Sequence, residues 1–169
     1  LTIFGGCDPR NLTPIFFNTL RRSFDIRCAG TSKYPCFEEY KGKKNFRFDL
    51  SCEELVREIL CSDLVISAGG QTLYEVASLG VPIVAVSTVE NQNPDVEGFQ
   101  KLGLAKVLNL ERVRWNALPD WLGSIKVSEL ERMIARMSTL LGDGTALRNE
   151  LLSYVNSRCY SKGSLGLCS

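Results

Sequence analysis

Short apolar runs alternate along this chain with segments in which apolar residues recur at the spacing of an amphipathic helix. The runs are rich in β-branched residues and apolar at nearly every position, which is typical of strands buried on both faces. Strands separated by helices in this way predict a parallel sheet covered on both sides. We therefore expect an α/β fold, a Rossmann-like doubly wound parallel sheet of about six strands. The expected strands cover residues 1–4, 24–29, 46–48, 64–67, 83–87 and 105–108.

Residues that start or stop helices place the helical segments between these strands. Thr13 and Pro14 suit the N-cap and first position of one helix, and Ser51 with Glu54 forms the capping-box pattern of another. Loops are expected at 31–44, which is polar and rich in lysine, and at 119–123; helices are expected at 13–22, 51–61, 72–79, 95–102, 127–141 and 145–158. We expect one domain over residues 1–160 and a mobile Ser- and Gly-rich tail over 161–169.

Composition narrows the kinds of partner. The 169 residues carry a net charge of +1, which gives no bulk attraction to nucleic acid. There is no apolar run long enough for a membrane span and no signal peptide at the start, so we expect a cytoplasmic protein. The seven cysteines include no C-x-x-C pair and are expected to be reduced and buried. Histidine is absent, which removes the commonest general base and metal ligand, and no metal or cofactor is expected.

Three turns that follow predicted strands are candidates for a binding site. Gly5-Gly6 follows the first strand, Gly69-Gly70 follows the fourth, and residues 90–92 follow the fifth. Ligands of open parallel sheets bind beyond the carboxyl ends of the strands, where these turns would meet. Glycine lets backbone amides approach an anion, and the helix starting near Gln71 and Thr72 aims further amides at the same point. The pattern favours a diphosphate site, although an isolated glycine pair is also compatible with a simple tight turn.

Side chains near these turns suit the sugar hydroxyls of a nucleotide. Glu75 lies one helical turn beyond Gln71, where its carboxylate could accept hydrogen bonds from a ribose; it could equally be a solvated glutamate that the helix dipole favours. Asn91 and Gln92 carry amides that suit sugar hydroxyls, but loops often carry such residues without any ligand.

Other nucleotide-binding and catalytic motifs are absent. The first turn reads GGCDPRN instead of G-x-G-x-x-G, and no acidic residue ends the second strand, so the dinucleotide fingerprint fails. The sequence contains no G-K-[ST] of a P-loop. It also lacks the G-x-S-x-G elbow that would present a serine nucleophile.

Two segments resemble known proteins. The segment ISAGGQTLYEVASLGVPIVAV, followed by ENQ, resembles the C-terminal, donor-binding domain of glycosyltransferase-B fold proteins, which include the N-acetylglucosaminyltransferase of peptidoglycan synthesis. The opening IFGGCDPRNLTP is similar to the UDP-sugar hydrolase of pseudaminic acid biosynthesis and to the spore coat polysaccharide biosynthesis proteins of the G type. The likeness covers about residues 1–110 well and the remainder loosely.

The resemblance implies a role for each candidate residue. In such proteins two Rossmann-like domains face each other across a cleft, and the C-terminal domain holds the UDP part of a UDP-sugar. The glycines Gly5, Gly6, Gly69 and Gly70, with Gln71 and Thr72, would surround the diphosphate. Glu75 would bind the ribose, and Asn91 and Gln92 would face the sugar or the phosphate. Uracil could be read by backbone groups of the loop at 30–40.

The resemblance also implies an activity for the parent protein. A UDP-linked amino sugar would be hydrolysed to free sugar and UDP in surface polysaccharide or nonulosonic acid biosynthesis, with water activated by a histidine of the N-terminal domain. This chain has no histidine, so we expect it to be inactive alone. Because its first residues form a core strand, as the second half of such a protein would, we expect it to be the C-terminal half of a two-domain parent. Catalytic residues would come from an N-terminal domain in cis or from a partner subunit in trans. The alternatives are the donor-binding domain or subunit of a UDP-sugar glycosyltransferase and a non-enzymatic nucleotide-binding module.

Overall fold

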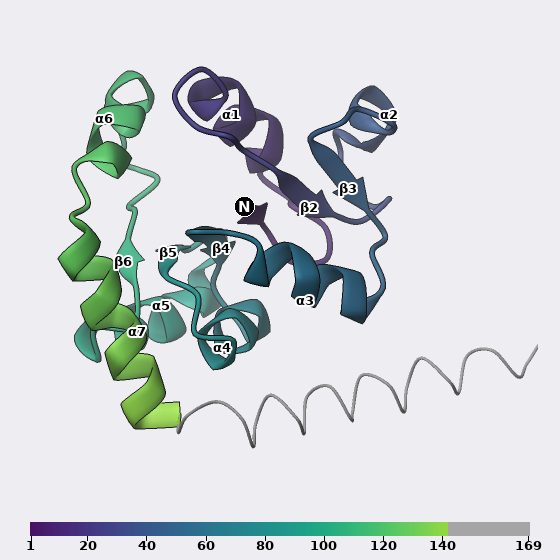
Figure 1. Cartoon of the computed structure of the whole chain (residues 1–169). Coiled ribbons are helices and arrows are strands. Elements are labelled where there is room, and N and C mark those ends of the chain that lie inside the picture. Colours follow the sequence, from purple (N-terminus) through teal and green to yellow (C-terminus); the bar gives the residue numbers. More distant parts are fainter. Residues whose placement is uncertain (142–169) are drawn as a thin grey trace, which may run out of the picture.

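The computed structural model describes residues 1–141 and contains one six-stranded parallel sheet (Figure 1). The strand order is β3-β2-β1-β4-β5-β6, so the doubly wound α/β architecture predicted from the sequence is confirmed. The strands are β1 (Thr2–Ile3), β2 (Cys28–Gly30), β3 (Phe46–Phe48), β4 (Val65–Ala68), β5 (Ile83–Val86) and β6 (Lys106–Val107). The helix expected at 145–158 and the tail at 161–169 lie outside the described residues.

Helices cover both faces of the sheet. The helices are α1 (Leu12–Leu20), α2 (Phe37–Tyr40), α3 (Cys52–Leu60), α4 (Gln71–Ser78), α5 (Asn93–Lys101), α6 (Leu118–Gly123) and α7 (Val127–Leu141), with short 3₁₀ turns η1 (Glu90–Gln92) and η2 (Trp115–Ala117). Alternate residues of β5 divide between the two cores: Ile83 and Ala85 pack with α4 and α5, whereas Val84 and Val86 pack with α1 and α6. Figure 1 shows the same division, with α1 and α6 on one side of the sheet and α4 and α5 on the other. Burial of both faces explains why β5 is apolar at every position.

The start of α3 follows the sequence prediction. Ser51 accepts a hydrogen bond from the backbone N–H of Glu54, and the Glu54 carboxylate accepts one from the backbone N–H of Ser51. This reciprocal capping box satisfies two donors that the first helical turn leaves free.

The predicted start of α1 is wrong. The helix begins at Leu12, and Thr13 lies inside it with a buried hydroxyl that has no partner among residues 1–141. Asp8 provides the cap instead, because its carboxylate accepts hydrogen bonds of 2.9 Å from the N–H groups of both Leu12 and Thr13. Asp8 is fully buried, so this carboxylate permanently occupies the anion-attracting end of α1.

Three other local expectations are corrected. Residues 119–123 belong to α6, because Pro119 falls in the first helical turn, where proline is tolerated, and Leu118 is buried. The predicted loop at 31–44 contains the short helix α2. The second strand does not begin at residue 24, because its pairing with β1 starts only at Cys28, opposite Thr2.

Only some of the described cysteines are buried. Cys28 and Cys36 are buried, as expected, whereas Cys7, Cys52 and Cys61 are exposed. The expectation of buried thiols is therefore wrong for three of the five described cysteines.

Within residues 1–141, no helix combines the length and apolar character that a bilayer crossing requires.

Candidate ligand-binding cleft

A cleft of about 500 Å³ lies beyond the carboxyl ends of the strands, centred on β1 and β4. The chain runs outward from β1 to β2 and β3 and then returns to place β4 on the other side of β1. This point of reversal is where open α/β sheets bind ligands. The volume is within the range of small-molecule sites. The cleft gathers eight of the nine predicted site residues: Gly5, Gly6, Gly69, Gly70, Gln71, Thr72, Glu75 and Gln92.

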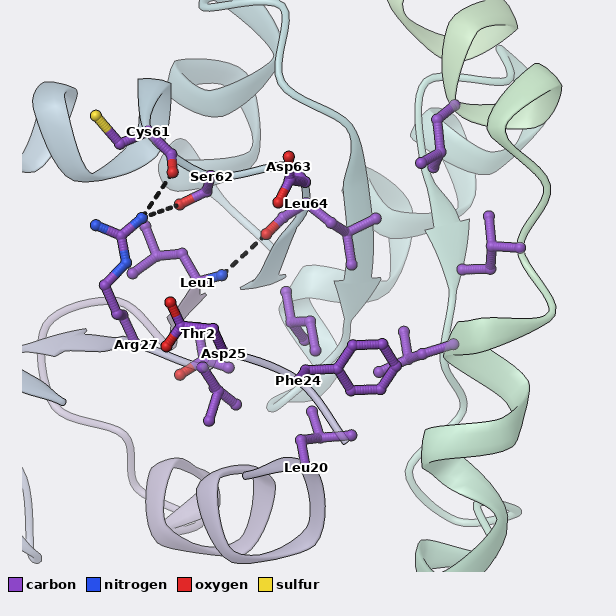
Figure 2. A pocket seen from close by; sticks show the side chains of 15 residues that line it. Leu1, Thr2, Leu20, Phe24, Asp25, Arg27, Cys61, Ser62, Asp63 and Leu64 are labelled. Carbon is purple, nitrogen blue, oxygen red and sulfur yellow. Dashed lines mark hydrogen bonds between the residues drawn. The ribbon is translucent and has the colours of Figure 1, made fainter. Parts of the chain in front are cut away.

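The opposite edge of the sheet carries a different kind of pocket. It has a volume of about 280 Å³ and is lined largely by apolar side chains, including Leu20, Phe24 and Leu64 (Figure 2). Some of its polar groups bond to each other, since the guanidinium of Arg27 donates to the backbone oxygen of Cys61 and to the hydroxyl of Ser62. This pocket lies at the amino ends of the strands and contains none of the predicted site residues.

The Gly5-Gly6 turn exposes backbone to the cleft. Gly5 has a φ of +74°, which favours glycine, but Gly6 does not have a positive φ. A Cβ placed on Gly6 would meet no atom of the described chain within 4 Å. Neither conformation nor packing within residues 1–141 therefore requires glycine at position 6. The lack of a side chain does leave its backbone open to a ligand.

Gly69 and Gly70 have different roles. A Cβ on Gly69 would lie 2.6 Å from the Cβ of Gln92 and 3.1 Å from Val96, and the Gly69 N–H already donates to the Val86 carbonyl. Gly69 is therefore needed for close packing of α5 against the end of β4. Gly70 has a φ of +96°, and a Cβ placed on it would meet no atom of the described chain within 4 Å. Its N–H has no acceptor among residues 1–141. The diphosphate role predicted for the pair thus suits Gly70 better than Gly69.

The N-terminus of α4 presents free amides to the cleft. Leu73 is the first residue of the helix whose N–H bonds to the chain, with Gly70 as its acceptor. The N–H groups of Gln71 and Thr72 therefore lack partners in the described structure, and both residues line the cleft. Unlike the end of α1, which Asp8 occupies, the end of α4 remains available for an anion.

Glu75 brings to the cleft wall a carboxylate that has no cationic side chain beside it among the described cleft-lining residues. Its side chain is half-buried, and burial raises the pKa of the carboxyl group above its usual value, while a hydrogen bond from the Gln71 side chain partly opposes the shift. No lysine or arginine is among the cleft-lining residues of the described chain. A carboxylate held here without a counterion is suited to accepting hydrogen bonds from neutral donors such as hydroxyls.

Gln92 and Asn91 separate in the structure. Gln92 lines the cleft and packs on Gly69, and its Oε1 accepts hydrogen bonds of 2.9 Å from the N–H and the hydroxyl of Thr88. Its amide NH₂ remains as a donor. Asn91 is exposed on η1 and does not line the cleft, so the structure does not bring it to the other predicted residues.

One wall of the cleft contains none of the predicted site residues. Thr31 follows β2, and Asp49 and Leu50 follow β3; all three line the cleft. The signal that could have identified them is topological, because β2 and β3 pair in parallel beside β1 and end at the same edge. Backbone groups of the loop at 30–40 could read a base, and of this loop Gly30 and Thr31 reach the cleft.

Comparisons with solved structures identify proteins of the same fold. The glycotransferase of kitacinnamycin superposes with a TM-score of 0.62 at 16% identity, over 91% of this chain and 42% of its own. CalG4, the calicheamicin glycosyltransferase, superposes with a TM-score of 0.62 at 14% identity, over 94% of this chain and 43% of its own. This chain shares its fold with part of a glycosyltransferase. It spans less than half the length of either protein.

No protein-family model matches the sequence, and no curated protein matches it. The two structural neighbours support the predicted glycosyltransferase-type fold. The narrower resemblance to UDP-sugar hydrolases and spore coat proteins finds no support in these comparisons.

The two cleft glycines should respond differently to alanine. Gly69→Ala should lower the free energy of unfolding by about 1–3 kcal/mol, because the new Cβ forces Gln92 or the backbone to shift. Gly6→Ala should change it by less than about 0.5 kcal/mol, because the added methyl group meets no neighbour. Urea denaturation of both variants measures the difference, and a loss for Gly69→Ala that is no larger than the loss for Gly6→Ala would contradict the packing role of Gly69.

Burial of the Glu75 carboxylate should appear as a pH-dependent stability difference. Because the folded-state pKa is raised, ionisation of Glu75 destabilises the folded protein at pH values above that pKa. Glu75→Gln should therefore be more stable than the wild type at pH 7. The advantage should vanish as the pH falls through the folded-state pKa to the lower pKa of an unfolded glutamate. Denaturation at pH 7 and pH 4 tests this, with Glu131→Gln, an exposed position of α7, as the matched control.

Proposed function

We propose that this chain binds the UDP moiety of a UDP-linked sugar in the cleft between the ends of β1 and β4. The observation that carries the proposal is that Gly6 lines the cleft with exposed backbone although the fold does not require glycine at this position. Opposite it, α4 offers the free amides of Gly70, Gln71 and Thr72. Two sets of main-chain donors around one space suit a diphosphate, and they need neither a metal nor a lysine.

The nucleoside would be recognised by carboxylate and backbone groups. Glu75 would accept hydrogen bonds from the ribose hydroxyls, a role that its missing counterion supports. The base would lie toward the wall formed by Asp49 and Leu50. The choice of uracil rests on the resemblance of the two quoted segments to UDP-sugar enzymes. The domain limit at residue 160 and a cytoplasmic location belong to the same proposal.

The reaction would be transfer of the sugar from UDP to an acceptor. Free amides at the start of α4 would stabilise the charge that develops on the departing diphosphate. The two structural neighbours are glycosyltransferases, and this chain matches less than half of each. Groups that activate the acceptor would therefore come from a second domain in cis or from a partner subunit in trans.

Hydrolysis of the UDP-sugar is the second candidate, and the opening IFGGCDPRNLTP favours it. The same donor cleft would serve both reactions, with water in place of the acceptor hydroxyl. Product analysis of the complete enzyme distinguishes them. Free sugar formed without an acceptor indicates hydrolysis, whereas dependence on an acceptor indicates transfer.

Two substitutions should separate the diphosphate and ribose contacts in calorimetric or NMR titrations with UDP and uridine. Gly6→Ala should lower the affinity for UDP at least tenfold, because a methyl group obstructs the backbone donors. Its affinity for uridine should stay within twofold of the wild-type value. Glu75→Ala should weaken both ligands by about 1–3 kcal/mol, as expected when a hydrogen-bonded group is removed. Glu131→Ala serves as the control and should alter neither affinity. A wild-type chain that binds no UDP would refute the proposed function.

A further inference from the structure

The carbonyl groups of both cleft glycines after β1 are held by one turn of the chain. The hydroxyl of Tyr34 donates a 2.8 Å hydrogen bond to the Gly5 carbonyl and accepts one of 3.2 Å from the N–H of Phe4. The hydroxyl of Thr31 donates a 2.7 Å hydrogen bond to the Gly6 carbonyl. Thr31 and Tyr34 belong to the same turn after β2, which is closed by a hydrogen bond from the Tyr34 N–H to the Thr31 carbonyl.

Packing fixes the position of Tyr34. Its side chain is buried, and the ring lies so close to Gly30 that any Cβ there would collide with it. Burial also raises the pKa of the phenol, so its hydroxyl stays protonated and remains a donor at physiological pH. The tyrosine therefore reaches from β2 to the end of β1 in one defined position.

These two bonds determine where the neighbouring amides point. In a trans peptide the N–H lies opposite the preceding carbonyl in the same plane. Fixing the Gly5 carbonyl therefore directs the N–H of Gly6 away from the turn, and fixing the Gly6 carbonyl does the same for the N–H of Cys7. Neither amide has an acceptor among residues 1–141. Because β1 lies between β2 and β4, a direction away from β2 leads toward the side of the sheet that carries β4 and its Gly70 turn, and Gly6 lines the cleft together with Gly70.

We propose that Thr31 and Tyr34 are positioning residues for diphosphate binding, which orient the Gly6 and Cys7 amides through their hydrogen bonds to the Gly5 and Gly6 carbonyls. The inference rests on the proposed function. Neither hydroxyl needs to touch the ligand. Their contribution is preorganisation, because donors that are already oriented lose little freedom when the anion binds.

The test compares UDP with uridine in single variants of the full chain. Tyr34→Phe and Thr31→Val each remove one hydroxyl with little change in shape. Each should lower the affinity for UDP about 3- to 10-fold, which is the effect of losing one hydrogen bond, and leave the affinity for uridine within twofold of the wild-type value. Thr31→Ser, which keeps the hydroxyl, should restore UDP affinity. Tyr40→Phe is the matched control, because Tyr40 is also buried but its hydroxyl contacts Asn18 on α1.

The outcomes separate this inference from the proposed function. A wild-type chain without UDP affinity overturns both. Normal UDP binding by Tyr34→Phe and Thr31→Val, with a competent wild type, overturns the positioning role alone. Equal losses of UDP and uridine in these variants would also overturn it, since they would indicate general loosening of the fold. The inference is supported if Thr31→Val and Tyr34→Phe lose affinity for UDP but not for uridine, while Thr31→Ser binds UDP as tightly as the wild type.

Discussion

The parallel pairing of β1 with β4 is the constraint on which the cleft depends. Thr2 pairs with Ile66 and Ile3 with Ser67, although more than sixty residues separate the two strands in the chain. This register ends both strands at one edge of the sheet and brings their glycine turns to opposite sides of one space. Backbone groups beyond the last paired residues have no ladder partner. They must bond to side chains or solvent, or remain available to a ligand.

The chain satisfies some of these groups and leaves others open in a consistent way. The carbonyls of Gly5 and Gly6 are bonded to Tyr34 and Thr31, while the N–H groups of Gly6 and Cys7 have no partner in the described structure. The start of α1 is closed by Asp8, while the start of α4 stays open. Donors therefore gather around the cleft, and its charged side chains are carboxylates. This division suits a ligand with an anionic centre and neutral hydroxyls at one end.

Periodicity was enough to predict the layers of the fold, because strands buried on both faces leave a direct record in the sequence. The capping box at Ser51 could also be predicted, because both partners lie within one helical turn. The start of α1 was not, because the cap comes from Asp8, which lies outside the usual capping positions and has a positive φ. The helix at 118–123 was missed because a first-turn proline resembles a loop signal until the burial of Leu118 is known.

The site followed the same rule. Residues adjacent to glycine turns, such as Gln71, Thr72 and Glu75, could be assigned from local spacing. Thr31, Tyr34 and Asp49 could not, because their roles arise from the pairing of β2 and β3 beside β1. Asn91 was assigned with Gln92 because the two are adjacent, but only Gln92 faces the cleft.

Amide chemical shifts during titration with UDP measure the central claim most directly. We predict that the largest changes fall on the backbone N–H groups of Gly6, Cys7, Gly70, Gln71 and Thr72. Changes concentrated instead around Phe24 and Leu64, at the opposite edge of the sheet, would contradict it. So would spectra that UDP leaves unchanged.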